Sequence, residues 1–263
     1  NFDLHKFLFS NLNKNKLIKF KKKINYHNLM KKDYSLIFNC DLQNSISKKF
    51  FYKKINKNYN SFAHVTTFNH KKLSNNNVAY QVFTKKGPIA FLPISKTETS
   101  VVYSLRDYDM KKNHDIKKLI KNFNPKYKIT NINDCGKFEL KSSNLRSYYN
   151  KNILAFGDLL HQVHPLAGQG FNMTIRDIQI LSKLIDQRLK IGLDIDSSVC
   201  NEFQKNLKDK NFIFSSGIDW IYELFNLKSK MNNKIINNSI KILGNNKLIN
   251  SLLKKFADSG LRI

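Results

Sequence analysis

Residues 157–172 read Gly157-Asp158-Leu159-Leu160-His161-Gln162-Val163-His164-Pro165-Leu166-Ala167-Gly168-Gln169-Gly170-Phe171-Asn172. This segment holds three of the nine glycines and one of the four prolines in a chain of 263 residues. A short apolar run at 152–156 precedes it and predicts a buried strand. Apolar residues at helical spacing follow it and predict a helix over 170–189: Phe171, Ile175, Ile178, Leu181 and Ile185. Segments between a strand and a helix are where ligands bind in open α/β sheets.

The residue types of this segment suit a ligand site. Asp158 follows the strand, and its carboxylate can accept hydrogen bonds from sugar or polyol hydroxyls. Gly157 lets the backbone come close to a ligand. Gly168 and Gly170 open the helix, whose free N–H groups favour a negatively charged group. The alternative for Asp158 is a plain helix N-cap.

The arrangement resembles the second flavin-binding motif of the class A flavoprotein monooxygenases, the para-hydroxybenzoate hydroxylase group. Within that group it is similar to the ubiquinone-biosynthesis hydroxylases. The matching positions are Gly157-Asp158, His161, His164-Pro165, Gly168-Gln169-Gly170, Asn172 and Arg176-Asp177. Residues 80–83 and 87–93 also resemble the substrate-side sheet of that family, and residues 216–225 resemble its C-terminal helices.

The resemblance implies FAD as the cofactor, NAD(P)H as a co-substrate and O2 as the oxidant. The implied cofactor-binding residues are Gly157, Asp158, Pro165, Gly168, Gln169, Gly170, Phe171, Asn172 and Asp41. Asp158 is expected to hold the ribityl or pyrophosphate region, and 168–170 to face the pyrimidine edge of the ring. Pro165 is the implied catalytic-site residue, as a rigid wall beside the reacting carbon. A flavin C4a-hydroperoxide is implied to transfer its distal oxygen to a phenol ring.

A second part of the cofactor site is expected around Asp41. Residues 33–45 are similar to the Asp-Gly motif of the family, in which the acid serves both the flavin and the NAD(P)H pyrophosphate. Asp41 keeps the acid and Ser45 keeps the hydroxyl. Leu42 stands where the family has glycine, and Lys48 stands where an arginine is usual.

The remaining pattern predicts an α/β chain of mixed α+β type. A short apolar run at 35–40 predicts a further buried strand, which ends at Asp41. Segments rich in Val, Phe, Tyr and Thr predict a mostly antiparallel sheet from strands at 61–68, 78–84, 88–94, 99–105, 126–131 and 136–141. Helices are expected at 2–12, 112–122 and through much of 196–257.

The resemblance implies a para-hydroxybenzoate hydroxylase-like FAD-binding fold with an interleaved antiparallel substrate sheet and a helical C-terminus. Residues 1–50 and 143–190 are expected to belong to the FAD-binding domain. Residues 51–142 are expected to form the substrate-side sheet domain, and 191–263 a C-terminal helical region. No Gly-x-Gly-x-x-Gly turn occurs in the chain, although the family opens with one. We therefore expect a fragment that lacks the first Rossmann βαβ unit.

The implied activity of the parent enzyme is hydroxylation of the aromatic ring of a polyprenylated phenol, a hydrophobic quinone precursor, in ubiquinone biosynthesis. Two alternatives remain at this point. One is a related hydroxylase with a soluble phenolic substrate. The other is a non-catalytic basic protein with a degenerate flavin fold that binds membranes or nucleic acid.

The net charge of +27 permits contact with an anionic surface. The lysines are spread along the chain and no nucleic-acid-binding motif accompanies them, so no nucleic-acid partner is expected. A peripheral contact with a membrane or a biosynthetic complex fits better. No apolar run reaches the roughly 18 residues of a spanning helix. Three scattered cysteines indicate a reducing compartment, so a cytoplasmic location is expected, with peripheral contact at the inner membrane face.

Several other residues are expected to have structural roles. His161 and His164 have the spacing of metal ligands but no convincing third ligand, so no metal site is expected. Arg176 and Asp177 are expected to form a local charge pair or a pair at the helix surface. The apolar tail residues are expected to pack in the core, among them Trp220, Phe225 and the Ile and Leu residues of 235–256.

Overall fold

The computed structural model describes residues 2–21, 26, 29, 34–106, 115–165 and 168–230. The chain divides into two units, Asn1–Tyr34 and Ser35–Ile263. The first unit carries helix α1 (Phe2–Asn13), which confirms the helix expected at 2–12. The second unit contains two sheets and the remaining helices of the described part, and it holds all the predicted site residues.

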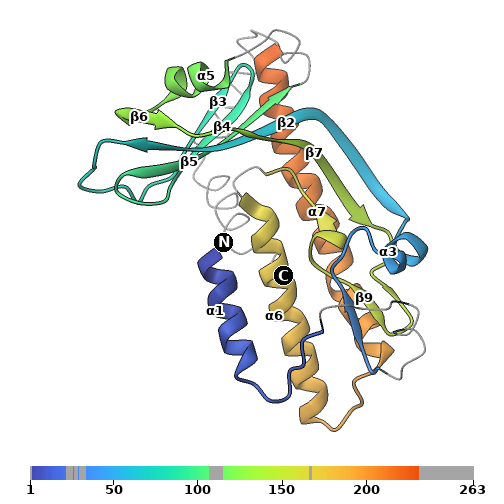
Figure 1. Cartoon of the computed structure of the whole chain (residues 1–263). Coiled ribbons are helices and arrows are strands. Elements are labelled where there is room, and N and C mark those ends of the chain that lie inside the picture. Colours follow the sequence, from blue (N-terminus) through green and yellow to red (C-terminus); the bar gives the residue numbers. More distant parts are fainter. Residues whose placement is uncertain are drawn as a thin grey trace. The chain divides into compact units, whose positions relative to one another are not determined.

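The larger sheet has seven strands and is antiparallel throughout, as predicted. Its strand order is β10-β7-β2-β5-β4-β3, and β6 also pairs with β2. The strands are β2 (Lys54–His70), β3 (Tyr80–Thr84), β4 (Gly87–Pro93), β5 (Glu98–Arg106), β6 (Ile129–Ile132), β7 (Gly136–Leu145) and β10 (His161–Gln162). Figure 1 shows β2 as a long strand in the middle of this sheet, where it lies between β7 and β5.

One face of the larger sheet carries the main apolar core. Phe68, Phe91 and Tyr103 are fully buried there and pack with Ile120 of helix α5 (Ile116–Phe123). Asp115 caps this helix by accepting a hydrogen bond from the Lys118 N–H at 3.2 Å. The predicted helix at 112–122 is confirmed over 116–122, and residues 112–114 lie outside the described residues.

The smaller sheet has three strands in the order β1-β9-β8, namely β1 (Ile37–Asn39), β9 (Ile153–Ala155) and β8 (Tyr149–Asn150). Strand β9 is fully buried, which confirms the prediction for 152–156. The prediction of a buried strand at 35–40 is correct for the strand but wrong for its burial, because Phe38 is 46% exposed. β1 pairs with β9 in parallel and with no other strand in the described part of the chain, so it is an edge strand of this sheet.

Two long helices follow the sheets, α6 (Gln169–Lys190) and α7 (Ser197–Lys230). Helix α6 confirms the predicted helix at 170–189. It buries Met173, which packs with Phe214 and Ile218 of α7. The expectation that Trp220 packs in the core is wrong, because its side chain is 64% exposed on α7. The Phe225 side chain and residues 235–256 lie outside what the structure describes.

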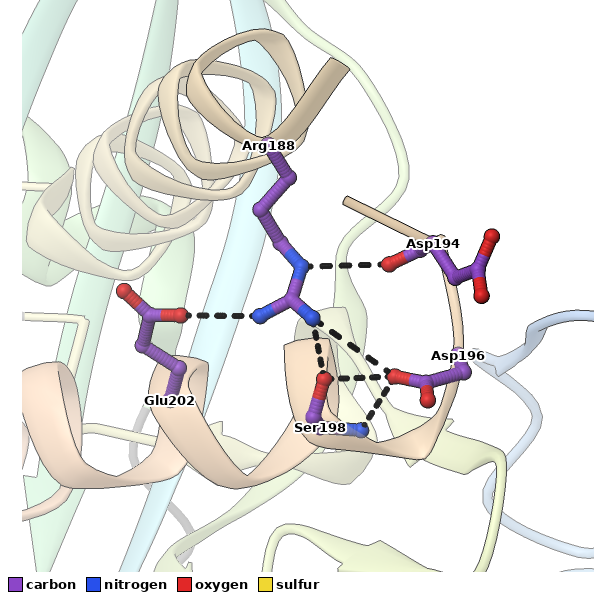
Figure 2. Close-up of polar contacts among 5 residues, drawn as sticks. All are labelled: Arg188, Asp194, Asp196, Ser198 and Glu202. Atoms are coloured by element: carbon purple, nitrogen blue, oxygen red, sulfur yellow. Dashed lines mark hydrogen bonds and ion pairs between the residues drawn. The ribbon is translucent and has the colours of Figure 1, made fainter. Parts of the chain in front are cut away.

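An arginine joins the end of α6 to the start of α7 (Figure 2). Arg188 Nε donates to the Asp194 carbonyl oxygen at 3.2 Å, and Nη1 lies 3.3 Å from Glu202 Oε2. Its Nη2 donates to the Ser198 hydroxyl and lies 3.8 Å from Asp196 Oδ1. The guanidinium thus binds oxygen atoms of the connection between the helices and of the first turns of α7. These contacts hold the end of α6 against the start of α7. In the described residues no helix is both long enough and apolar enough to cross a membrane.

Candidate functional site

The predicted loop begins at the carboxyl end of β9, beside the end of β1. Asn39 pairs with Ala155 in the parallel register, and the Phe156 N–H donates to the Asn39 carbonyl oxygen at 2.9 Å. Because the two strands are parallel, Asp41 and Asp158 follow them at the same edge of the sheet. The two acidic residues that the sequence singled out, 117 positions apart, therefore follow the ends of two neighbouring strands.

Asp158 is exposed and is not a helix cap. It lies within a single 3-10 turn, η1 (Gly157–Leu159), whose N-cap residue is Phe156. Gly157 has a left-handed backbone, with φ of +63°, and turns the chain out of the buried strand. The N-cap alternative for Asp158 is therefore wrong, and its carboxylate is presented to solvent beside the strand end.

The N-terminus of α6 also lacks a side-chain cap. Gly168 is the N-cap residue in a left-handed conformation with φ of +66°, and it provides no side-chain cap for the first turn. No acidic residue occupies that turn. The N–H groups of Gly170 and Phe171 lie in the first turn of the helix and precede its first intrahelical bond. This end is electrostatically suited to a negatively charged or electron-rich ligand edge.

The other predicted loop residues surround this helix end. Pro165, Phe171 and Asn172 are exposed, whereas Gln169 and Gly170 are half-buried. A Cβ added to Gly170 would lie 3.7 Å from Val163 Cγ2, an ordinary van der Waals distance. The backbone of 166–167 lies outside the described residues. The exposed residues of this loop combine apolar side chains, Pro165 and Phe171, with the polar side chains of Asp158 and Asn172, which is the mixture found in cofactor sites.

Asp41 has a local structural partner. Its Oδ1 accepts a hydrogen bond from the Gln43 N–H at 2.7 Å, which forms a tight turn before helix α3 (Ser45–Phe50). Leu42 adopts this turn without a positive φ, so the missing glycine causes no backbone strain. Ser45 is exposed, and the hydroxyl that bonds to the Asp41 carbonyl oxygen belongs to Ser47.

The pattern missed a buried polar pair behind the loop. His161 Nε2 lies 2.6 Å from Asp177 Oδ2, and the two side chains are 1% and 0% exposed. Arg176 lies 3.5 Å from the other carboxylate oxygen of Asp177 and also donates to Asn211. The expectation of a local charge pair at Arg176 and Asp177 is therefore confirmed, whereas the alternative of a pair at the helix surface is wrong, because Asp177 is fully buried. Asp177 instead ties the loop to the middle of α6 through His161.

His164 is also completely buried. Its ring packs against Tyr59 of β2, with centroids 4.8 Å apart, and against Tyr222 of α7 at 4.4 Å. Neither ring nitrogen has a hydrogen-bond partner in the described structure. In the described residues no cluster of three His, Cys, Asp or Glu side chains could hold a metal ion. The two histidines of the loop instead have separate neighbours.

Acid is expected to destabilise the protein through His164. Burial, followed by the charge of Lys57, lowers the pKa of His164 to about 4. Above pH ~6.5 its imidazole is neutral in both the folded and the unfolded chain. As the pH falls from there toward 4, only the unfolded chain binds the proton. Folding stability should therefore fall by about 2 kcal/mol between pH 7 and pH 5 through this group.

Urea unfolding at the two pH values measures this loss. The matched variant His164→Phe keeps a ring of similar shape but has no titrating group. It should lose about 2 kcal/mol less than the native chain over the same interval. An identical pH dependence of both proteins would contradict a neutral, buried His164.

A cavity of about 430 Å³ lies elsewhere, between the end of α6 and the start of α7. Its lining includes Leu184, Leu193, Arg188 and Glu202. The guanidinium of Arg188 is already bonded to the chain's own oxygens (Figure 2). No residue of the 157–172 loop lines this cavity, so it does not belong to the predicted site.

Comparison with known proteins identifies relatives of the chain. Ubiquinone biosynthesis monooxygenase COQ6, mitochondrial, from Xenopus tropicalis is 26% identical over 212 residues, which cover 65% of this chain and 46% of the relative. 3-Demethoxyubiquinol 3-hydroxylase from Escherichia coli (strain K12) is 29% identical over 155 residues, covering 56% and 39%. The chain thus spans about half the length, or less, of these relatives.

Solved structures share the fold. A probable FAD-dependent monooxygenase, pqsL from Pseudomonas aeruginosa, superposes with a TM-score of 0.57 at 17% identity, over 73% of this chain and 56% of the other. OxyS anhydrotetracycline hydroxylase from Streptomyces rimosus gives 0.58 at 13% identity, over 87% and 46%. The expected FAD-dependent monooxygenase fold is therefore confirmed. Because the squalene epoxidase family model matches residues 33–246, which include both strand ends, the loop and both long helices, the chain belongs to the squalene epoxidase family.

Proposed function

We propose that this chain carries the isoalloxazine side of the FAD site in a monooxygenase that hydroxylates the ring of a polyprenylated phenol in ubiquinone biosynthesis. NAD(P)H and O2 are the proposed co-substrates. The observation that carries the proposal is the loop at 157–172, where an exposed carboxylate lies between a strand end and an uncapped helix N-terminus. The printed names of the COQ6 and 3-demethoxyubiquinol relatives support the choice of pathway.

The residues present fit a flavin. Asp158 can accept hydrogen bonds from the ribityl chain, because its carboxylate is exposed and does not serve as a helix cap. The N–H groups at Gly168, Gln169 and Gly170 can meet the pyrimidine edge of the ring. Gly157 and Gly168 have no heavy atom within 4 Å of an added Cβ, so open space lies beside both.

When bound, FAD supplies the redox and oxygen chemistry, and the protein supplies position and electrostatics. The α6 N-terminus stabilises negative charge on a bound ring by roughly 0.3–2 kcal/mol. Pro165 has no N–H and presents a rigid apolar surface that limits how the ring and the substrate can approach. Phe171 and Asn172 extend the exposed surface at the helix start.

Asp41 contributes at the neighbouring strand end. Its Oδ1 holds the turn, which leaves the second carboxylate oxygen available on an exposed residue. We assign it a supporting place in flavin and NAD(P)H binding, because it shares an edge of the sheet with Asp158. The larger sheet would cover the phenol, which matches the proposed division into FAD-binding parts at 1–50 and 143–190, a substrate sheet at 51–142 and a helical region at 191–263.

The proposed setting is peripheral to a membrane. A polyprenylated substrate is delivered from a lipid phase, and the excess of 46 Lys and Arg over 19 Asp and Glu favours an anionic membrane surface or an acidic partner in a biosynthetic complex. The COQ6 relatives carry the word mitochondrial in their printed names. The proposed contact with an inner membrane face rests on the charge of this chain and the nature of the proposed substrate.

Asp158→Ala is expected to weaken flavin binding by roughly 10- to 100-fold, the effect of losing hydrogen bonds to a charged group. Quenching of flavin fluorescence by the chain, titrated with riboflavin and with FAD, measures the affinity. Asp186→Ala removes an exposed carboxylate near the C-terminal end of α6, away from the predicted site, and should leave the affinity unchanged.

A second form of the experiment adds the N-terminal segment of a full-length relative in trans. Flavin binding that needs this segment, and that Asp158→Ala abolishes, would support a shared site. A folded native chain that quenches neither flavin, with or without the segment, would refute the flavin proposal. It would favour a basic membrane-binding protein with a degenerate flavin fold.

A further inference from the structure

His164 makes an unusual set of contacts for a buried histidine. Its side chain is 0% exposed, yet both ring nitrogens lack a hydrogen-bond partner in the described structure. Burying a polar atom without a partner lowers the stability of the folded chain. Packing against neighbouring side chains must offset this cost, so the ring is held by shape and not by hydrogen bonds.

Two tyrosines provide that packing from different parts of the fold. Tyr59 belongs to β2 and meets the His164 ring edge to face, with an interplanar angle of 87°. Tyr222 belongs to α7 and lies at an angle of 32° to the imidazole. The tyrosine rings also contact each other, with centroids 5.1 Å apart. The three rings therefore connect the loop, the larger sheet and the last described helix.

Polar contacts fix the two tyrosines. The Tyr59 hydroxyl donates to Asp219 of α7. The Tyr222 hydroxyl lies 3.0 Å from Ser61 Oγ of β2. Burial, together with the bond to Asp219, raises the pKa of Tyr59, so this hydroxyl keeps its proton.

The charged groups around the rings come from the same two elements. Lys57 of β2 lies 3.2 Å from Glu223 and 3.9 Å from Asp219 on α7. Its ammonium group also lies 5.4 Å from the centroid of the Tyr59 ring. These pairs hold β2 against α7 and leave no carboxylate bonded to the His164 ring.

We propose that His164 is a positioning residue that fixes Pro165 and the start of α6 relative to β2 and α7, through the packing of its ring between Tyr59 and Tyr222. His164 directly precedes Pro165, and a proline restricts both its own backbone and that of the residue before it. Gly168, the N-cap residue of α6, follows His164 by four positions. The aromatic cluster thus sets where the uncapped helix end lies relative to the larger sheet.

The consequence for cofactor binding rests on the proposed function, but the positioning itself does not. Amide hydrogen exchange of residues 172–175, the first hydrogen-bonded turn of α6, reports how firmly the helix start is held. His164→Ala should lower the protection factors of these amides about tenfold more than those of 101–103 in β5. His164→Phe should keep them within about twofold of the native chain, because its ring fills the same space.

His64→Ala is the matched control, because His64 is also a buried histidine with an unpartnered ring nitrogen. It lies on β2 opposite Tyr103, so its loss should lower protection in β5 and leave 172–175 unchanged. If His164→Ala does not fold, His164→Leu carries the same test, since it fills much of the volume without a ring. Native protection of 172–175 in His164→Ala or His164→Leu would overturn the proposal. Equal losses in His164→Phe and His164→Ala would also overturn it.

Riboflavin titration of the same variants separates the two proposals. If the native chain binds riboflavin and His164→Ala shows native exchange at 172–175, the positioning role fails while the flavin site stands. If exchange rises as expected but no variant binds a flavin, the positioning role stands and the flavin proposal fails. Weaker flavin binding in His164→Ala, restored in His164→Phe, would support both.

Discussion

Asp177→Ala is expected to lower the free energy of unfolding by about 3 kcal/mol, because it leaves a buried hydrogen-bonding group without its partner and removes the carboxylate beside the Arg176 guanidinium. The carboxylate is 0% exposed and holds His161 Nε2 at 2.6 Å. His161 Nδ1 already lacks a partner in the described residues, so the variant would leave a buried imidazole with no hydrogen bond at all. Arg176 would lose a nearby opposite charge as well. Urea unfolding followed by circular dichroism measures the change.

Three variants separate this effect from a general loss on α6. Asp186→Ala removes an exposed carboxylate from the same helix and should change stability by no more than about 0.5 kcal/mol. Asp177→Asn keeps an acceptor oxygen for His161 and should cost less than alanine. The double variant His161→Leu with Asp177→Leu should recover much of the loss, since apolar residues tolerate the buried position. If Asp177→Ala resembles Asp186→Ala, the buried pair does not stabilise the fold.

Most strands of the larger sheet could be predicted, because segments rich in β-branched and aromatic residues are separated by turn residues. The full length of β2 could not be predicted. The sequence indicates a strand at 61–68, whereas β2 begins at Lys54. Residues 54–58 are rich in lysine and asparagine and show no apolar alternation. They are extended because they pair with β7, from Lys54 opposite Leu145 to Asn58 opposite Lys141. Pairing with a distant strand overrides local propensity here.

The glycines of the candidate site could be predicted from the sequence, because their backbone conformations need glycine. The partners of its buried polar side chains could not be predicted. Gly157 and Gly168 both adopt the left-handed backbone that glycine favours, at the two ends of the loop. His161 and His164 could not be assigned from the pattern, since a polar residue in a loop gives no sign of its partners. One signal was available for Asp177. Met173, Asp177, Leu181 and Leu184 form the buried stripe of α6 at helical spacing, which places an acid in an apolar row.

Several of the apolar residues from which the helix was predicted lie on an exposed face of α6 and not on its buried face. Phe171, Ile175 and Ile178 do have helical spacing, but they are 63%, 39% and 47% exposed. Periodicity establishes the helix and the existence of an apolar face, but not which face is covered in the described chain. The same limit explains Trp220, because a large apolar side chain on a helix need not point toward the core.

Gly87→Ala is expected to lower the free energy of unfolding by at least about 3 kcal/mol. Gly87 begins β4 with φ of +140°, a conformation that L side chains rarely adopt. A Cβ at this position would lie 2.0 Å from the Ser104 carbonyl oxygen of β5. That oxygen is backbone and cannot rotate away, so the start of β4 must move off β5. The loss should appear in urea unfolding and as faster amide exchange at 101–105.

Gly192→Ala distinguishes the clash from the cost of the backbone conformation alone. Gly192 follows the end of α6 with φ of +72°, and an added Cβ would meet no heavy atom within 4 Å. Alanine there should cost only about 1–2 kcal/mol, the penalty of a left-handed residue. The difference between the two variants therefore measures the contact with Ser104. Equal losses would mean that β4 can shift without disturbing the pairing of Ile89 with Tyr103, and that the larger sheet is less rigid at this edge than its buried core implies.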